Sequence, residues 1–167
     1  MHQLLSPRKG FTLIELVIVV GIIAILASMN VASLSAVRGK VNDARRLWDM
    51  RQLSSLIHAE NTGQGVPMEL EGCVNDALAS SLTTSCSGPG MIVQYRRFQD
   101  PAQLTSQTPC SKNSITTCGY SISQRDGAKR AITDNYQMCF YLEQGGAGLK
   151  AGLNSITDGG TFRAGCR

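Results

Sequence analysis

Residues 8–16 of the chain read RKGFTLIEL, so two cations and a glycine lead directly into an apolar run. Residues 17–29 continue this run as VIVVGIIAILASM and carry no charge. Glu15 is therefore a carboxylate inside a segment that is otherwise almost wholly apolar. A comparable carboxylate at the centre of a membrane helix costs at least about 2.5 kcal/mol, so Glu15 needs a partner. That partner must be another group of this chain or a second molecule.

The apolar run at residues 11–30 is long enough to form a membrane-spanning helix. In lipid the backbone must satisfy its own hydrogen bonds, which favours a helix over a strand despite the many valines and isoleucines. Two interpretations fit Arg8 and Lys9, which precede the run. They belong either to a leader that is removed at Gly10, or to an uncleaved flank that stays on the cytoplasmic side.

An amphipathic half of the same helix is predicted at residues 31–61. Apolar side chains recur there at steps of three and four residues, which indicates one buried stripe. The members of this stripe are Val31, Leu34, Val37, Val41, Ala44, Trp48, Leu53, Leu56 and Ile57. Charged residues such as Asp43, Arg46 and Asp49 are assigned to the other faces. Trp48 is predicted to lie in the core.

The signals that end or bend the helix are few. The stretch NTGQG at residues 61–65 predicts its end, because glycines and polar residues interrupt the periodicity there. Gly39 is a candidate bend within the amphipathic half, and Gly21 is either a close-packing point or a tolerated small residue.

The remaining residues, 62–167, predict a globular head that is rich in glycine, serine and threonine. Alternating apolar residues predict strands at 118–123 and 137–143, with a turn at 125–127 between them. The head must cover the apolar stripe of the helix. The predicted fold class is therefore α+β, with a long N-terminal helix packed on a small antiparallel β-sheet head that carries disulfides.

Other parts of the head give weaker signals. Residues 74–82 favour a short helix, whereas residues 91–98 fit either a strand or a helical turn. From Gly145 onward the chain is glycine-rich, so this tail is predicted to be loop-like and to need a tie.

All six cysteines lie in the head, at positions 73, 86, 110, 118, 139 and 166. An even number of cysteines behind a membrane segment indicates disulfides formed in an oxidising compartment. A zinc site is the alternative, but the closest spacing lacks the paired pattern that zinc sites show. Of the possible pairings, we favour those that are local or that tie down the tail. These are Cys73–Cys86, Cys110–Cys118 and Cys139–Cys166.

Composition and motifs give little support for an enzyme or a metalloprotein. The net charge is +4 in 167 residues, too nearly neutral to indicate a nucleic-acid partner by itself. The sequence contains no G-x-S-x-G element, P-loop or H-E-x-x-H string, so neither catalytic residues nor a cofactor is predicted. His58 and Glu60 are two positions apart on the helix and face different directions, which favours a surface histidine over a metal or catalytic pair.

Two further groups of residues have a functional and a structural interpretation. Asp158, with Asn154, is either part of a calcium loop or simply a turn, and the turn is favoured because calcium needs at least six oxygen ligands. The pairs Arg96–Arg97 and Lys129–Arg130 are either a DNA-binding patch or a solvated basic face. Nearby aromatic residues Tyr95, Phe98 and Tyr136 are the components of single-strand binding. The solvated face is favoured.

The string KGFTLIEL at residues 9–16 resembles the class III signal of the type IV pilin and pseudopilin superfamily. The resemblance covers residues 1 to about 60. It implies that a membrane-embedded prepilin peptidase and methyltransferase cuts between Gly10 and Phe11 and methylates the new amino terminus of Phe11. It also implies that Glu15 fixes the subunit register by pairing with the amino terminus of a neighbouring Phe11 in a dry filament core. Residues 28–32 lack the helix-breaking proline that is frequent in the family.

The resemblance implies four regions and a structural function. The regions are a leader at 1–10, a transmembrane or filament-core half of the helix at 11–30, an amphipathic half at 31–61 and the head at 62–167. The chain is expected to be a prepilin that polymerises into an extracellular type IV pilus for adhesion, motility or DNA uptake. The alternatives are a pseudopilin of a type II secretion or competence machine, and a membrane-tethered binding module that does not polymerise.

The resemblance also implies partners and a location. The expected partners are the prepilin peptidase, an inner-membrane assembly platform and other copies of the chain in a helical filament. Before assembly the chain is expected to span the cytoplasmic membrane once, with its N-terminus in the cytoplasm. Afterwards it is expected in the extracellular pilus.

Overall fold

A computed structural model describes residues 10–70, 73, 81–86, 95–103, 108–128 and 130–167, and the side chains of residues 29–33, 62–64 and 81 also lie outside this description. The chain divides into two compact units, Met1–Val37 and Arg38–Arg167, which we describe separately. Arg8 and Lys9 fall outside the described residues.

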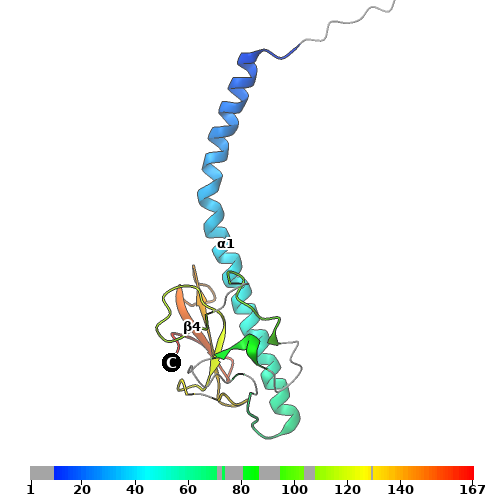
Figure 1. Ribbon diagram of the computed structural model, residues 1–167, viewed down its shortest axis with the longest axis vertical. Helices are drawn as coiled ribbons and strands as arrows, with labels where there is room; N and C mark the ends of the chain where they lie inside the picture. The colour runs from blue at the N-terminus through cyan, green and yellow to red at the C-terminus, as the bar shows by residue number, and fades with distance from the viewer. Residues whose placement is uncertain (1–9, 71–72, 74–80, 87–94, 104–107, 129) are drawn as a thin grey trace, which may run out of the picture. The chain divides into compact units, whose positions relative to one another are not determined.

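Helix α1 runs from Leu13 to Gln64 and contains 52 residues (Figure 1). It ends where the sequence predicts, because Gly65 takes a left-handed conformation (φ +70°) and its N–H donates to the Asn61 carbonyl oxygen at 3.2 Å. The helix continues through Gly39, which is buried. A Cβ atom at Gly39 would lie 3.1 Å from Cγ of Gln144, so this glycine allows close packing of the head against the helix.

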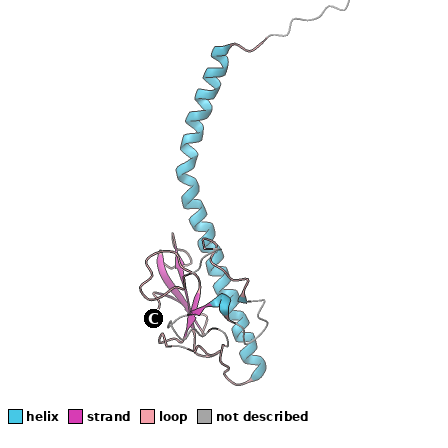
Figure 2. Ribbon diagram, in the orientation of Figure 1, coloured by secondary structure: helices cyan, strands magenta, loops and turns pink. Residues whose placement is uncertain are grey.

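The head of the second unit contains a five-stranded antiparallel sheet in the order β1-β2-β3-β4-β5 (Figure 2). The strands are β1 (Ser81–Leu82), β2 (Ser121–Ser123), β3 (Gln137–Leu142), β4 (Gly152–Thr157) and β5 (Phe162–Ala164). Strands β3 and β4 pair along their full lengths, from Gln137 opposite Thr157 to Leu142 opposite Gly152. The α+β fold class, with a long helix on a small antiparallel sheet, is confirmed.

The strands agree with the sequence prediction only in the middle of the head. Strands β2 and β3 lie within the two predicted segments. The prediction of a loop-like tail is wrong, because β4 and β5 form there. The glycines of this tail serve as strand ends and turns, with positive φ at Gly152 and Gly160, while Leu153 and Ile156 contribute to two hydrophobic clusters.

The other two uncertain segments fall mainly outside the described residues. Of the helix predicted at residues 74–82, residues 74–80 are not described, and the last two form strand β1 instead. At 91–98 only the last four residues are described, and they contain a helical turn at Tyr95.

The main core of the head lies between α1 and one face of the sheet. From α1 it contains Leu47, Met50, Leu53 and Ile57, and from the sheet Ile122, Met138, Phe140, Leu142 and Ile156. Further members are Leu70, Cys73, Cys86, Tyr95, Phe98, Tyr120, Ala131 and Tyr136. The helix residues recur at steps of three and four, so a single face of α1 is buried.

The predicted stripe lies mostly on the wrong face of α1. Trp48 is 57% exposed and Val41 is 62% exposed, so the assignment of Trp48 to the core is wrong. Conversely, Asp43, Arg46 and Asp49 are buried. The burial of these charges is possible because the head supplies their partners, as described below.

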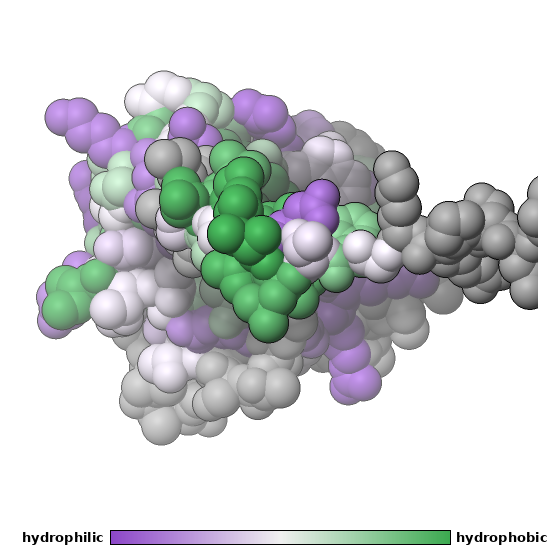
Figure 3. Space-filling view, turned by 90° about the horizontal axis from the view of Figure 1, so that it is seen from above, coloured by the Kyte–Doolittle hydropathy of each residue, from purple (hydrophilic) through white to green (hydrophobic). Residues whose placement is uncertain are grey.

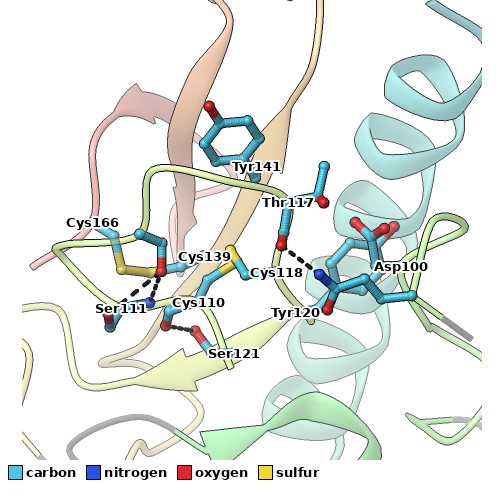
Figure 4. The surroundings of a disulfide bond; sticks show 12 residues. Asp100, Cys110, Ser111, Thr117, Cys118, Tyr120, Ser121, Cys139, Tyr141 and Cys166 are labelled. Carbon is cyan, nitrogen blue, oxygen red and sulfur yellow. Dashed lines mark hydrogen bonds between the residues drawn. A yellow bond between two sulfur atoms is a disulfide. The ribbon is translucent and has the colours of Figure 1, made fainter. Parts of the chain in front are cut away.

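A second, smaller cluster lies on the opposite face of the sheet. It contains the disulfides Cys110–Cys118 and Cys139–Cys166, packed with Tyr141 and Leu153 (Figure 4). The third disulfide joins Cys73 to Cys86 in the main core. These are the three pairs that the sequence analysis favours.

Candidate processing and assembly site

The predicted cleavage site lies at an exposed position just before α1. A Cβ atom built at Gly10 would meet nothing within 4 Å, and the side chain of Phe11 is 84% exposed. The helix begins two residues later, at Leu13. The bond between Gly10 and Phe11 therefore lies in an exposed, non-helical segment.

Glu15 occupies the first turn of α1 and is bound by Thr12. Its Oε2 accepts hydrogen bonds from the Thr12 backbone N–H at 3.3 Å and from the Thr12 hydroxyl at 3.0 Å. The Glu15 N–H in turn donates to Oγ1 of Thr12 at 3.4 Å. This reciprocal arrangement is a capping box, and a carboxylate at this position also interacts favourably with the helix dipole.

Thr12 is the partner that the sequence reasoning missed. The signal was present, since a threonine three residues before a glutamate is the sequence pattern of a capping box. The hydroxyl and the backbone N–H of this threonine bind the Glu15 carboxylate without a cation. Glu15 therefore has a local partner in the isolated subunit.

The N-terminal half of α1 exposes its apolar side chains on all sides. From residue 11 to residue 26 the large hydrophobic side chains are Phe11, Leu13, Ile14, Leu16, Val17, Ile18, Val19, Val20, Ile22, Ile23, Ile25 and Leu26, and each is at least 46% exposed. Figure 3 shows part of this surface as a green area. An apolar surface of this size is typical of a segment that binds lipid or other protein chains.

Within the described residues, no helix combines the length and the hydropathy that crossing a membrane requires.

In the second unit, a buried ion cluster fastens the head to α1. We define it as Arg46, Asp43, Asp100 and Glu143. Arg46 is fully buried and donates to both carboxylate oxygens of Asp100, at 2.7 and 2.9 Å. Its Nη1 also donates to Asp43 at 2.9 Å and to Glu143 at 2.8 Å. The guanidinium thus joins the helix to two separate segments of the head.

The charges of this ion cluster stabilise the ionised form of Arg46. Burial alone would lower the pKa of the Arg46 guanidinium, but hydrogen bonds to Asp100 and the negative charge of Asp100 raise it, together with Glu143 and Asp43. The net effect is a raised pKa, so Arg46 carries its charge at every pH at which the protein folds.

Asp43 has a second function, as a cap for the loop after β3. Its carboxylate accepts the backbone N–H groups of Glu143 at 2.8 Å, Gln144 at 2.6 Å and Gly145 at 2.9 Å. One side chain of α1 therefore binds three successive backbone N–H groups of this loop.

Asp49, two turns further along α1, is bound by Tyr120. The tyrosine hydroxyl donates to Oδ2 of Asp49 at 3.0 Å. Burial raises the pKa of the Asp49 carboxyl and nearby Asp100 raises it further, against the opposing effects of Tyr120 and Arg45. Burial likewise raises the pKa of the Tyr120 hydroxyl. Tyr120 therefore remains a neutral donor to this carboxylate.

The remaining candidate residues have structural surroundings. The side-chain amide of Asn154 is buried and donates to the carbonyl oxygens of Lys150 and Gly152, and Asp158 pairs with Arg125. His58 is exposed on α1. In the part of the chain that the structure describes, no group of three potential metal ligands comes together.

The aromatic residues that lie near the basic pairs in the sequence, Tyr95, Phe98 and Tyr136, are buried. Arg96 and Arg97 are exposed, but their neighbours Tyr95 and Phe98 are buried in the main core. Burial and the charge of Glu60 raise the pKa of Tyr95 to about 12. Lys129 lies outside the described residues. The aromatic residues therefore stabilise the head and do not form a surface for stacking bases.

The chain matches a known family motif and is similar to a known pilus protein. The prokaryotic N-terminal methylation motif matches residues 5–29. The chain is also similar to the type IV wide pilus major component PilA4 of Thermus thermophilus, with 32% identity over 96 residues. The alignment covers 52% of this chain and 73% of the relative. No solved structure matches the chain.

Proposed function

The chain belongs to the type IV pilin family, and on this basis we propose that it is the structural subunit of an extracellular type IV pilus. The observation that carries the proposal is the start of α1. There an exposed Gly10–Phe11 bond precedes a capped Glu15 and a helix whose apolar side chains are exposed on all sides. A head alone would not need such a helix, whereas a filament buries it among copies of itself.

Processing supplies the group that Glu15 binds in the filament. Prepilin peptidase cuts after Gly10 and methylates Phe11, which leaves a positive amine at the start of the helix. In the filament core this amine pairs with Glu15 of a neighbouring subunit, in surroundings where a charge pair is strong. Thr12 binds the same carboxylate before assembly, so Glu15 is never without a partner.

The exposed face of the second unit contributes further subunit contacts. Val41 and Trp48 are seven residues apart on α1, so they share a face, and both are more than half exposed. A groove of about 890 Å³ lies beside Trp48, lined by Leu56 and Phe98 among others. Burial of this face against neighbouring heads accounts for apolar residues that the head itself leaves uncovered.

Before assembly the subunit is held in the cytoplasmic membrane. The sequence of residues 11–30 supplies the apolar span, and Arg8 and Lys9 set the N-terminus on the cytoplasmic side. An inner-membrane platform then transfers subunits from lipid into the filament. The exposed side chains of α1 exchange lipid contacts for contacts with other helices.

Two observations favour a pilus over a secretion pseudopilus. The similar PilA4 protein is named as the major component of a wide pilus. The head is closed by three disulfides, and Asp158 pairs with Arg125, which supports the turn over the calcium loop. Adhesion, motility and DNA uptake are all compatible with such a filament.

The test is the composition of filaments sheared from the cell surface. We expect mass spectrometry of their main component to give a chain that begins at N-methylated Phe11, and we expect electron microscopy to show no filaments in a Gly10→Val variant, whose cleavage is blocked. A wild-type subunit that retains Met1, or abundant filaments made of uncleaved Gly10→Val protein, would contradict the proposal. Filaments that form only inside the cell envelope would indicate a pseudopilin.

A further inference from the structure

A small polar pocket of about 180 Å³ lies on the face of the sheet that points away from α1. Its lining consists of Arg125, Gln137, Ser155, Thr157, Arg163, Ala164, Gly165, Cys166 and Arg167. All of these residues belong to the head, and none belongs to the predicted processing or assembly residues.

Strand register places the polar side chains of this pocket on one face. Ser155 of β4 lies opposite Arg163 of β5, and Gln137 of β3 lies opposite Thr157. Side chains two residues apart on a strand share a face, whereas Ile156 between them points into the main core. Ser155 and Thr157 are both largely buried, and both line the pocket.

Arginine side chains form the walls of the pocket. Within the part of the chain that the structure describes, Arg163 and Arg167 form no ion pair, whereas Arg125 pairs with Asp158. Asp126 lines the adjoining pocket with Arg125 and Arg167. Arg163 lies opposite Ser155 in the sheet and, within the described residues, is not neutralised by an ion pair.

The pocket is held in shape by covalent and hydrogen bonds. The disulfide Cys139–Cys166 fixes the last residues over the sheet. The Gln137 side chain donates to the backbone oxygen of Arg167 at 2.9 Å and accepts the Arg167 N–H at 3.4 Å. The Gly165 N–H donates to the carbonyl oxygen of Leu153 at 2.8 Å. Binding therefore requires little ordering of the backbone, which favours affinity.

We propose that this pocket binds a tetrahedral oxyanion, as free phosphate or sulfate or as the end group of a phosphorylated or sulfated molecule. Guanidinium groups bind such oxygens through paired N–H donors, and the hydroxyls of Ser155 and Thr157 supply further donors at the floor. The volume accommodates a single tetrahedral group but not a nucleic-acid chain. The site is independent of the proposed assembly function, because it uses none of the residues of α1.

The experiment titrates detergent-solubilised full-length protein with sodium phosphate, and with chloride at the same ionic strength, by isothermal titration calorimetry. We expect saturable phosphate binding in the millimolar range, no saturable chloride binding, and at least tenfold weaker phosphate binding in Arg163→Gln. Arg97→Gln is the matched control, because it removes an equal charge from an exposed position outside the pocket. We expect it to bind as the wild type does.

Two further measurements define the chemistry. Arg163→Lys keeps the positive charge but loses the planar guanidinium group with its paired N–H donors. We therefore expect its phosphate affinity to lie between that of the wild type and that of Arg163→Gln. Titration with a sugar phosphate tests the source of the group: equal affinity indicates an end group, and weaker affinity indicates the free anion. Absence of saturable phosphate binding, or equal losses in Arg97→Gln and Arg163→Gln, would overturn the proposal. Near-UV circular dichroism checks that each variant is folded.

Discussion

Arg46 of helix α1 and Asp100 of the head form a two-point ion pair in the protein interior, with Nε to Oδ2 at 2.7 Å and Nη2 to Oδ1 at 2.9 Å. Both side chains are fully buried. The same guanidinium binds the buried Asp43 and the partly exposed Glu143, so one arginine serves three carboxylates. Buried charges contribute stability only when every partner is present, which makes this pair a sensitive point of the fold.

Replacement of Asp100 by Asn is expected to destabilise the protein by about 3–5 kcal/mol, because it leaves the buried Arg46 without its main counter-charge. Denaturant unfolding of the full-length protein measures the change. Arg130→Gln serves as the control, since Arg130 pairs with Glu69 at the surface, 3.3 Å away, and such pairs contribute about 0–1 kcal/mol. Similar losses in both variants would show that burial of the ion pair is unimportant.

Asp49→Asn is expected to stabilise the protein at neutral pH. Burial raises the pKa of Asp49 in the folded protein above 3.8, its value in the unfolded chain. Protonation of Asp49 therefore stabilises the fold below pH 3.8, and this stabilisation is lost as pH rises through the pKa of the folded protein. At pH 7 the ionised carboxylate is therefore a cost. Asparagine removes the charge and still accepts the Tyr120 hydroxyl. We expect the stability difference between variant and wild type to grow from pH 4 to pH 7, and thermal unfolding at several pH values measures it. A variant that is less stable at pH 7 than at pH 4, relative to the wild type, would contradict this assignment.

Trp48 is mostly exposed and Met50 is fully buried. The two residues therefore test which face of α1 packs against the head. Trp48→Ala is expected to change the stability of the isolated subunit by no more than about 0.5 kcal/mol, because the side chain is mostly exposed. Met50→Ala removes a fully buried side chain and is expected to cost about 2–5 kcal/mol. Denaturant unfolding of monomeric protein in detergent distinguishes them. If Trp48→Ala were the more destabilising change, the buried face of α1 would be the stripe predicted from the sequence.

The error over Trp48 has a physical cause. The stripe that contains Val41 and Trp48 and the buried set that contains Asp43, Arg46 and Met50 both follow steps of three and four residues. Hydrophobicity alone selects the first. The second is chosen by partners that are distant in sequence, since Asp100 and Glu143 lie 54 and 97 residues from Arg46.

The ends of α1 were more predictable than its faces, because their signals are local. The glycine at position 65 ends the helix and the polar residues before it mark the boundary. Strand β4 was missed for the opposite reason. Its residues, GLNSIT, carry little strand signal, and they form a strand because β3 and β5 pair with them on either side.

The disulfides close loops of different length, so we expect their contributions to stability to differ. Replacing Cys139 and Cys166 together by serine removes a link across 27 residues, which contributes about 3.5 kcal/mol by loop entropy. The pair Cys110 and Cys118 spans 8 residues and contributes about 2.5 kcal/mol by the same relation. We expect the first double variant to have the lower unfolding midpoint in denaturant. If loss of the shorter loop proves more destabilising, packing of the Cys110 and Cys118 sulfurs outweighs loop closure.

Thr12 and Glu15 are expected to have separable effects on assembly. Thr12→Ala removes both hydrogen bonds made by the hydroxyl, which weakens the helix start by about 0.5–2 kcal/mol, but it leaves the Glu15 carboxylate free to bind the amine of a neighbouring Phe11. We therefore expect filaments from Thr12→Ala, in reduced number, and none from Glu15→Ala. Glu15→Gln keeps a hydrogen-bond acceptor for Thr12 but loses the charge, so it should cap the helix and still fail to assemble. Counting surface filaments by electron microscopy, with immunoblots to equalise subunit levels, measures all three. Filaments in Glu15→Gln at the level of the wild type would show that the capping box, and not a charge pair between subunits, is the function of this carboxylate.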